Sequence, residues 1–268
     1  MPTVIVTGAT RGIGRAAVVE LARRGAEVAV VGRDADRVRE TAREVGPPAH
    51  EHVADLARMD EVRRLAAELL ERYPRIDVLA NNAGAMFSSR HVTPDGFEQT
   101  FALNHLAPFL LTSLLLERLT ASAARVVTTA SDTHRGGQLD LHDLQSANGR
   151  YRPGRAYATS KLCNVLFTRE LQRRNPGLAA NCFHPGVVRS GFARNDGALL
   201  RFGAKLIGPF LRSPRSGAQT LVALALGPQG GELRGKYLEK GRPAAPSAQA
   251  QDEHLAAELW QRSAQLVR

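Results

Sequence analysis

Short apolar runs alternate with amphipathic stretches from the first residues of the chain onward. "TVIVTG" (3–8) is a β-branched run that ends at a glycine, and "GRAAVVELARRG" (14–25) repeats apolar residues at helical spacing before another glycine. "AEVAVVG" (26–32) is a second strand-like run. Together the three pieces predict a β-strand, an α-helix and a second β-strand in succession.

The alternation continues over most of the remaining sequence. Further strands are expected near residues 51–55, 76–84, 124–131, 178–186 and 235–239. Helices are expected at 35–45, 59–72, 96–119 and 155–174, as short pieces around 194–226, and at 252–267. This order predicts an α/β fold: a doubly wound, mostly parallel, seven-stranded sheet with helices on both faces. A ligand would bind at the carboxyl ends of the strands.

Length and composition fit one domain over residues 1–268. A chain of 268 residues with 43% hydrophobic content can bury a single large core. No apolar run reaches the ~20 residues of a membrane span, and the first residues lack the features of a signal peptide or hydrophobic anchor, so we expect a soluble cytoplasmic protein. Cys163 and Cys182 form no CxxC pair, which argues against a disulfide framework or a thiolate metal site.

The chain carries a formal charge of +10, and arginine supplies most of its cations. A basic protein of this kind could bind nucleic acid or an anionic membrane surface. The arginines are nevertheless scattered among glutamates, as in "RRLAAELLERYPR" (63–75), and no basic tract is interleaved with aromatic residues. We therefore expect no nucleic-acid partner, and the positive field would favour a polyphosphate cofactor.

The first predicted strand ends in "TGATRGIG" (7–14), with glycines at positions 8, 12 and 14. Glycines at a sharp strand-to-helix turn let the backbone approach a pyrophosphate, whose charge is stabilised by the helix N-terminus. The spacing is GxxxGxG rather than GxGxxG, and a plain tight turn is the alternative. The position between the first strand and the first helix favours a nucleotide site.

A tyrosine and a lysine stand four residues apart in "YATSK" (157–161). In a helix that spacing places both side chains on one face. A phenol beside an ammonium has a lowered pKa, because the positive charge favours the phenolate. The pair is a candidate acid and base, although the spacing alone does not distinguish it from surface packing.

Five motifs occur in the order of a known family: "TGATRGIG" (7–14), "NNAG" (81–84), Ser131, "YATSK" (157–161) and "HPG" (184–186). With these motifs the sequence resembles the short-chain dehydrogenases/reductases from Thr3 to about Val267. Three stretches are similar to the retinol-dehydrogenase-like branch: "NHLAPFLLT" (104–112), "SKLCNVLFTREL" (160–171) and "HPGVVRS" (184–190). The resemblance implies a Rossmann-type fold and an NAD(P)-dependent oxidoreductase that interconverts an alcohol and a carbonyl.

The resemblance also implies four catalytic residues. Tyr157 would act as acid/base on the substrate oxygen, and Lys161 would lower the pKa of Tyr157 and hold the nicotinamide ribose. Ser131 would hydrogen-bond the substrate oxygen, and Asn104 would hold a water that links Lys161 to solvent. Alternatively, Ser131 could only cap the turn that follows, and Asn104 could bond to backbone. His134 follows Ser131 by three residues, but no GxSxG elbow supports a serine hydrolase.

The cofactor-binding residues implied by the resemblance lie at the ends of several strands. They are Gly8, Thr10, Arg11, Gly12, Ile13, Gly14, Arg33, Asp55, Leu56, Asn82, Ala83, Gly84, Tyr157, Lys161, Pro185, Gly186, Val188 and Ser190. Asp55 and the backbone of Leu56 would bind adenine, with a plain helix start as the alternative for Asp55. Residues 82–84 would line the adenosine ribose. Residues 185–188 would lie along the nicotinamide, with Ser190 near the phosphates.

The end of the second strand, "VVGRD" (30–34), bears on the choice of cofactor. A carboxylate there binds the ribose diol of NAD, whereas an arginine matches the 2′-phosphate of NADP. Gly32 stands where an NAD-preferring relative would carry Asp, and Arg33 follows it. We therefore expect NADP(H) rather than NAD, with Arg11 as a second cation and Asp34 as the cap of the next helix. The alternative is that both arginines are merely solvated.

The substrate is expected to be a small carbonyl or alcohol. The resemblance suggests retinoid, steroid or other lipophilic compounds, and a secondary metabolite or xenobiotic carbonyl is equally compatible. Residues 189–215 carry apolar spacing with glycines, typical of a mobile substrate lid or of two packed surface helices. Residues 241–268 are expected to form a docked tail, in which a Pro/Ala/Ser-rich surface crossing precedes the last helix.

Other interpretations find less support in the residues. A non-catalytic NADP-binding sensor or scaffold would keep the glycine turn but would not need Ser131, Tyr157 and Lys161. His50 and His52 alternate along a weak strand without a third ligand, so we expect no metal site. A homo-oligomer stays open, because nothing in the sequence decides it.

Overall fold

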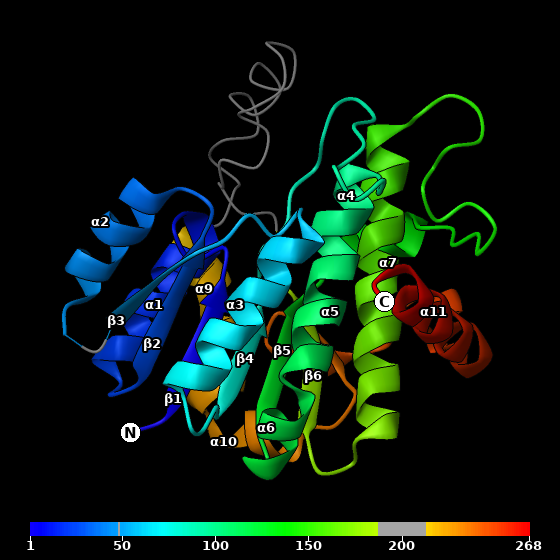
Figure 1. Ribbon diagram of the computed structural model, residues 1–268. Coiled ribbons are helices and arrows are strands. Elements are labelled where there is room, and N and C mark those ends of the chain that lie inside the picture. Colours follow the sequence, from blue (N-terminus) through cyan, green and yellow to red (C-terminus); the bar gives the residue numbers. More distant parts are fainter. Residues whose placement is uncertain (48, 187–212) are drawn as a thin grey trace.

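The computed structural model describes residues 1–47, 49–186 and 213–268. Its centre is an eight-stranded sheet with the order β3-β2-β1-β4-β5-β6-β7-β8 (Figure 1). Neighbouring strands from β3 to β7 run parallel, and β8 pairs antiparallel with β7. The strands are β1 (Thr3–Thr7), β2 (Glu27–Gly32), β3 (Ala49–Val53), β4 (Val78–Asn81), β5 (Arg125–Thr129), β6 (Ala179–His184), β7 (Tyr237–Glu239) and β8 (Arg242–Ala244). The expected mostly parallel α/β fold is confirmed, with one edge strand more than predicted.

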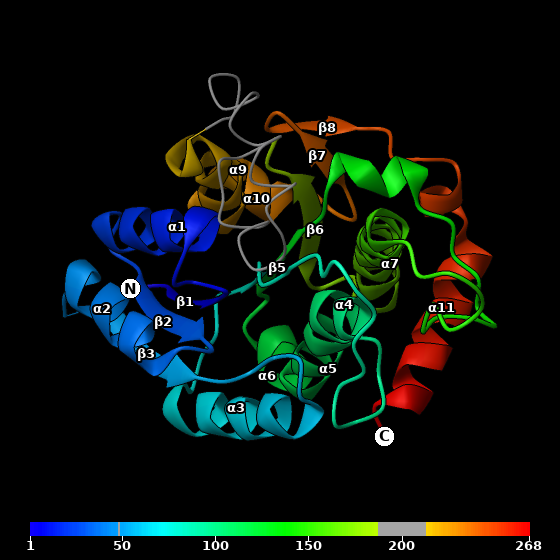
Figure 2. The same ribbon diagram turned by 90° about the horizontal axis from the view of Figure 1, so that it is seen from above.

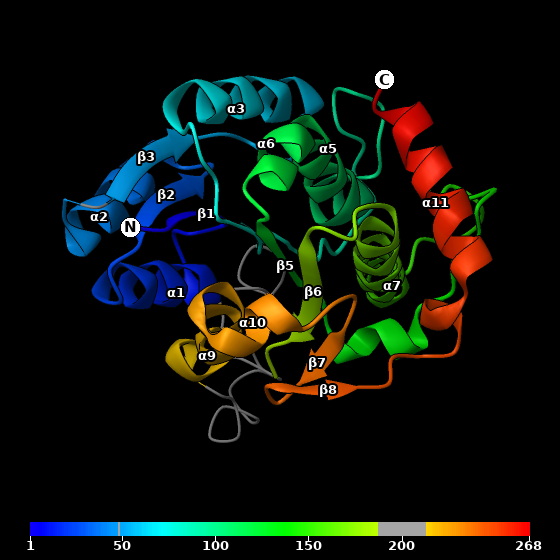
Figure 3. The ribbon, with the colours of Figure 1, turned by 90° about the horizontal axis from the view of Figure 1, so that it is seen from below.

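Helices cover both faces of this sheet (Figures 2 and 3). The α-helices are α1 (Gly12–Arg23), α2 (Ala35–Val45), α3 (Met59–Arg72), α4 (Gln99–Phe101), α5 (Ala107–Leu114), α6 (Leu116–Ala121), α7 (Pro153–Arg174), α9 (Pro214–Leu226), α10 (Pro228–Glu232) and α11 (Glu253–Leu266). Three further turns are the π-helical η1 (Ala102–Leu106) and the 3₁₀-helical η2 (Asp132–Gly136) and η5 (Gln249–Gln251). Helices α1, α2 and α9 pack on one face, and α3, α5 and α7 on the other.

Alternation along β1 shows how the sheet divides the core. Val4 and Val6 point to the face that α1 and α9 cover, whereas Ile5 points to the face that α3 and α5 cover. All three side chains are fully buried. Successive side chains of a strand point to opposite faces, so a strand covered on both faces must be apolar throughout. That requirement explains the continuous apolar runs of the first two strands.

The long helix expected at 96–119 is confirmed in its main part, but it begins at Gln99 and contains a π-helical turn, η1, between α4 and α5. Pro108 stands in the first turn of α5 and has no N–H, so it cannot donate to the Asn104 carbonyl as a regular α-helix requires. At the end of the π-helical turn, the Ala107 N–H donates instead to the Ala102 carbonyl, five residues back. Turns of this kind often occur at functional sites.

The C-terminal residues pack against α7 (Figure 3). Trp260 of α11 lies with its ring centroid 4.9 Å from that of Phe109 and 5.9 Å from that of Phe167. Strand β8 falls within the stretch 241–251, for which the sequence predicted an irregular crossing. Its Pro243 is compatible with a strand only because β8 is an edge strand. Among the described residues, no helix is both long and apolar enough to cross a membrane.

Candidate active site

The turn between β1 and α1 packs tightly against the end of β4. Gly8 and Gly12 have φ angles of +65° and +52°, in the left-handed region that favours glycine. A Cβ atom on Gly14 would lie 2.1 Å from the Gly8 carbonyl oxygen, and one on Gly8 would lie 2.8 Å from the Ala83 Cα. A larger residue at position 8 or 14 would therefore push the turn apart.

Helix α1 begins at Gly12, and no side chain of the described residues caps its N-terminus. Its N-cap residue is Arg11, which makes no capping hydrogen bond, and no acidic residue lies in the first turn. The first N–H groups of the helix and the positive end of its dipole together attract a phosphate. The turn, with Thr10 and Ile13 beside it, therefore fits the pyrophosphate of a dinucleotide cofactor.

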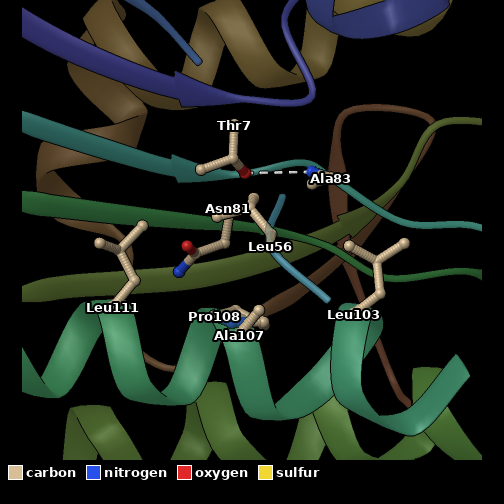
Figure 4. A pocket seen from close by; sticks show the side chains of 8 residues that line it. All are labelled: Thr7, Leu56, Asn81, Ala83, Leu103, Ala107, Pro108 and Leu111. Carbon is tan, nitrogen blue, oxygen red and sulfur yellow. Dashed lines mark hydrogen bonds between the residues drawn. The ribbon is translucent and has the colours of Figure 1, made fainter. Parts of the chain in front are cut away.

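Thr7 and Asn82 join the carboxyl ends of three neighbouring strands. The Thr7 hydroxyl accepts hydrogen bonds from the N–H group of Asn82 at 2.9 Å and from that of Ala83 at 3.1 Å; Figure 4 shows the second bond. It donates to the Ala80 carbonyl at 3.2 Å. The Asn82 side chain donates to the Thr7 carbonyl (3.0 Å) and accepts from the Thr129 hydroxyl (3.2 Å). The ends of β1, β4 and β5 are thus tied together beside the glycine turn.

A small cavity of about 10 Å³ lies between these strands and α5 (Figure 4). It is lined by Thr7, Leu56, Asn81, Ala83, Leu103, Ala107, Pro108 and Leu111. The Asn81 side chain donates to the Thr112 hydroxyl at 3.0 Å, whereas its Oδ1 atom has no hydrogen-bond partner among the described residues. The volume suits at most one water, which needs about 10–15 Å³ on this measure. The cavity is therefore no substrate pocket.

Tyr157 and Lys161 lie together on α7, beside the end of β5. The Lys161 Nζ atom is 5.6 Å from the centroid of the Tyr157 ring and donates to the Thr129 carbonyl at 2.9 Å. The Ser131 side chain lies near enough to Tyr157 to lower the pKa of its hydroxyl. Lys161 is 2% exposed. The structure therefore brings together three of the four residues that the sequence nominates as catalytic.

Burial governs the pKa values of this pair. It raises the pKa of Tyr157 to about 12, and the hydrogen bond with Ser131 acts in the opposite direction. It lowers the pKa of Lys161 to about 8. The expectation that the pKa of Tyr157 lies near neutrality is wrong for this structure, because the lost hydration of the phenolate outweighs the opposing effect of Ser131. At neutral pH the pair is a neutral phenol beside a charged ammonium.

Asn104 lies in η1 and is fully buried. Its Oδ1 atom accepts from the Ala85 N–H (2.9 Å), and its Nδ2 group donates to the Ala85 carbonyl and the Ser160 hydroxyl, each at 2.9 Å. The alternative that Asn104 bonds to backbone is therefore confirmed. The same Oδ1 atom and Lys161 Nζ lie 3.1 and 3.2 Å from the place that a Cβ on Gly84 would occupy. The relay role of Asn104 stays a prediction.

Ser131 also caps the turn that follows it. Its hydroxyl oxygen accepts from the Thr133 N–H at 3.3 Å at the start of η2. The expected alternative, that Ser131 caps the following turn, is therefore confirmed, and Ser131 also contacts Tyr157. The two are compatible, because a hydroxyl can accept one hydrogen bond and donate another.

The end of β2 carries the residues expected to select the cofactor. A Cβ on Gly32 would lie 2.6 Å from the Thr10 Cγ2 atom and 2.9 Å from the Val38 Cγ2 atom. Asp34 caps α2 with its side chain, as expected. Arg33 is exposed, and within the described part of the chain no hydrogen bond or ion pair engages its side chain.

Asp55 precedes α3 by four residues, so the alternative that it starts this helix is wrong. Its carboxylate accepts from the Ala57 N–H at 3.1 Å and stabilises a local turn. Leu56 is buried against the small cavity. The adenine contacts of Asp55 and Leu56 stay predictions.

The remaining cofactor residues follow β6. Pro185 and Gly186 are described, and Gly186 has a φ angle of +83°. Val188, Ser190 and most of the lid expected at 189–215 lie outside the described residues.

Sequence reasoning missed three small polar side chains that hold the site together. Thr129 ends a strand just before Ser131, whereas Thr7 is the first residue of "TGATRGIG" and Ser160 lies inside "YATSK". The Ser160 hydroxyl donates to the Tyr157 carbonyl at 2.7 Å and accepts from Asn104. A hydroxyl residue at a strand end beside a motif is a signal that could have identified the two threonines.

The two histidines considered as metal ligands have other partners. The His50 Nε2 atom lies 2.9 Å from Glu27 Oε1, and the His52 Nε2 atom lies 3.2 Å from the Tyr73 hydroxyl. Over residues 1–47, 49–186 and 213–268, no group of three or more His, Cys, Asp or Glu side chains could hold a metal ion.

The short chain dehydrogenase family matches residues 2–198, well over half of the chain. The chain belongs to this family. Its match contains the glycine turn, Ser131 and the Tyr157/Lys161 pair described above. As a short-chain dehydrogenase/reductase it is an oxidoreductase acting on CH–OH groups, and enzymes of this family use NAD or NADP.

Two curated relatives extend over nearly the whole chain. DnrU of Streptomyces sp. (strain C5), named for daunorubicin C-13 ketoreductase activity, is 46% identical over 99% of this chain and 92% of its own length. Human retinol dehydrogenase 13 is 40% identical over 99% of this chain and 84% of its own length. The resemblance to the retinol-dehydrogenase-like branch is thereby confirmed.

Solved structures with the same fold match the chain over most of its length. An uncharacterised protein from Mycobacterium paratuberculosis matches with a TM-score of 0.80 and 34% identity, covering 100% of this chain and 93% of that one. RhlG of Pseudomonas aeruginosa, in complex with NADP, matches with a TM-score of 0.71 and 28% identity, covering 89% of this short-chain dehydrogenase and 94% of that chain.

Proposed function

We propose that this enzyme is an NADP(H)-dependent oxidoreductase that interconverts a lipophilic or secondary-metabolite carbonyl and its alcohol, with Tyr157 as the acid/base. The observation that carries the proposal is the cluster of Ser131, Tyr157 and Lys161: the Lys161 ammonium lies 5.6 Å from the tyrosine ring, and the Ser131 side chain lowers the pKa of Tyr157 against the effect of burial. This cluster stands at the carboxyl ends of the parallel strands, where α/β proteins bind ligands.

A nicotinamide cofactor, when bound at the glycine turn, would supply the hydride for carbonyl reduction. Tyr157 protonates the substrate oxygen, and it carries this proton at neutral pH because burial holds its pKa at about 12. The Ser131 hydroxyl donates a hydrogen bond to the same oxygen and stabilises its developing charge. The Lys161 ammonium stabilises the phenolate that remains on Tyr157.

After each turnover Tyr157 must take up a proton again, and the space beside Gly84 offers a route for that proton. The Oδ1 atom of Asn104 and the Nζ atom of Lys161 both lie within 3.2 Å of the point where a Cβ of Gly84 would stand. A water there would accept from the ammonium and donate to the amide oxygen. This geometry supports a relay from solvent through Asn104 and Lys161 to Tyr157.

The preference for NADP(H) is supported by the end of β2. Thr10 and Val38 crowd the Cβ position of Gly32, so an aspartate for the ribose diol of NAD has little room there. Asp34 is committed to capping α2. Arg33 is exposed and next to this turn, with Arg11 at the start of α1, and a guanidinium matches a 2′-phosphate. RhlG, which carries NADP, is consistent with this assignment.

The substrate class is supported by the relatives. DnrU is named for the reduction of a ketone of daunorubicin, a secondary metabolite, and retinol dehydrogenase 13 for the oxidation of retinol, a lipophilic alcohol. A lipophilic ketone, aldehyde or alcohol is therefore the first class to test.

The test uses the purified protein with NADPH and a panel of lipophilic ketones and aldehydes, followed at the nicotinamide absorbance. We expect turnover of at least one compound, faster with NADPH than with NADH. Binding of NADPH without turnover of any compound would favour a sensor or scaffold instead. Equal rates with both cofactors would contradict the preference for NADP(H) but not the proposed oxidoreductase activity.

A further inference from the structure

His134 is fully buried in the turn after Ser131, and the proposed reaction does not use it. Its Nδ1 atom lies 2.7 Å from the Ser131 carbonyl oxygen, and its Nε2 atom lies 3.1 Å from the Ser247 backbone nitrogen. A backbone N–H can only donate, so Nε2 is the acceptor and the ring hydrogen is on Nδ1. The ring is therefore neutral and donates to the Ser131 carbonyl.

The surroundings hold the imidazole in this orientation. The ring centroid lies 4.8 Å from that of Tyr237, with an angle of 57° between the ring planes. Burial lowers the pKa of His134, which keeps the neutral form that both hydrogen bonds require. The Ser131 carbonyl also accepts from the His134 backbone N–H at 3.1 Å, so one side chain and one backbone group fix the same peptide.

Segment 245–249, which follows β8, braces the same turn from outside (Figure 2, orange beside green). Besides the Ser247 bond, Arg135 donates to the Ala245 carbonyl at 2.9 Å, and the Gln249 side chain accepts from the Leu139 N–H at 3.3 Å. On the other side the turn presses on α7, since a Cβ on Gly137 would lie 2.7 Å from the Ala158 carbonyl oxygen. The turn therefore packs between segment 245–249 and α7, the helix that carries Tyr157.

We propose that His134 is a positioning residue for Ser131. Its Nδ1–H bond to the Ser131 carbonyl fixes the backbone from which the Ser131 hydroxyl reaches Tyr157, and its Nε2 atom anchors that turn to segment 245–249. The inference rests on the proposed function, because it assigns Ser131 to the stabilisation of the substrate oxygen. A rigid support matters here because a misplacement of about 1 Å can cost roughly 100-fold in rate.

Two substitutions of His134 test the hydrogen bonds of its two ring nitrogens one at a time. Asparagine in His134→Asn reaches the Nδ1 position and can donate to the Ser131 carbonyl, whereas glutamine in His134→Gln reaches the Nε2 position and can accept from the Ser247 N–H. We expect His134→Gln to lower kcat by roughly 10-fold or more with an unchanged KM for NADPH, and His134→Asn to retain kcat within about threefold. His142→Gln, an exposed histidine of the same loop, should behave like wild type.

Thermal melting and NADPH binding are measured on each variant, so that loss of folded protein is not read as loss of kcat. Equal kcat values for His134→Gln and the wild type would overturn the inference. So would equal losses in both His134 variants that follow their losses in melting temperature, because these would mark a purely structural residue. A wild type that turns over no substrate would instead contradict the proposed function, on which the inference depends.

Discussion

The Lys161 ammonium donates a hydrogen bond to the Thr129 carbonyl oxygen at 2.9 Å, and this neutral acceptor stands in place of a carboxylate. Lys161 is 2% exposed, and within the described part of the chain it forms no ion pair. Removing a charge from water without a counter-ion is costly. Such a lysine is useful only where negative charge forms beside it, as on the Tyr157 phenolate during turnover.

Lys161→Met should therefore stabilise the protein while abolishing turnover. The pKa of Lys161 falls from 10.5 to about 8 on folding, so its burial costs on the order of 3 kcal/mol at neutral pH. Thermal or urea unfolding at pH 7 should show a gain on that scale, reduced by the lost bond to Thr129. A variant less stable than the wild type at pH 7 would contradict this account.

The pH dependence of that gain follows from the direction of the shift. Between pH 8 and 10.5 the unfolded chain binds more protons at this lysine than the folded chain does, so wild-type stability from this group rises with pH. The advantage of Lys161→Met should be full below pH 8 and disappear above pH 10.5. Unfolding free energies of the wild type and Lys161→Met, measured at several pH values, check this prediction. A stability difference that does not change with pH would show that the charge of Lys161 is not its cause.

Tyr157→Phe should lower kcat at least ~100-fold, because general acid catalysis contributes that much or more. NADPH binding, measured by fluorescence titration, should change little. Tyr151→Phe is the matched control, since within the described residues the Tyr151 hydroxyl bonds Thr100 and Glu98, away from the cluster. Turnover in Tyr157→Phe comparable to that in Tyr151→Phe would remove Tyr157 from the acid/base role.

Arg33→Ala should erode the preference for NADPH over NADH. A lost charge-assisted hydrogen bond to a phosphate is worth about 1.5–3 kcal/mol, so the ratio of kcat/KM values should fall roughly 10- to 100-fold. Arg39→Ala serves as the control, because Arg39 is an exposed arginine on α2 that pairs with Asp36. An unchanged ratio in Arg33→Ala would mean that another group binds the 2′-phosphate.

Gly14→Ala should destabilise the protein and weaken NADPH binding. Its Cβ would lie 2.1 Å from the Gly8 carbonyl oxygen, a backbone atom that cannot move without opening the turn. A loss of about 1–3 kcal/mol in unfolding free energy is expected for this overpacking. Gly154→Ala, at an open helical position, should be neutral or slightly stabilising. Equal stability of the two variants would contradict the tight turn.

The sequence by itself determined the features that depend on local spacing. Period-two and helical patterns located most strands and helices, because burial on one or two faces imposes those periods on the chain. The glycine turn could be predicted because its conformation is set by neighbours within a few residues. The four-residue spacing of Tyr157 and Lys161 likewise placed both on α7, since one helical turn separates them.

Only the tertiary structure decided what depends on distant partners. The bond from Ser247 to His134 joins segments 113 residues apart, and no local pattern encodes it. The π-helical turn could have been suspected from Pro108, but its bonds between Asn104 and Ala85 required the packed site. The pKa values of Tyr157 and Lys161 also follow from three-dimensional burial. Loss of hydration depends on every element that surrounds a group, which the sequence near that group does not contain.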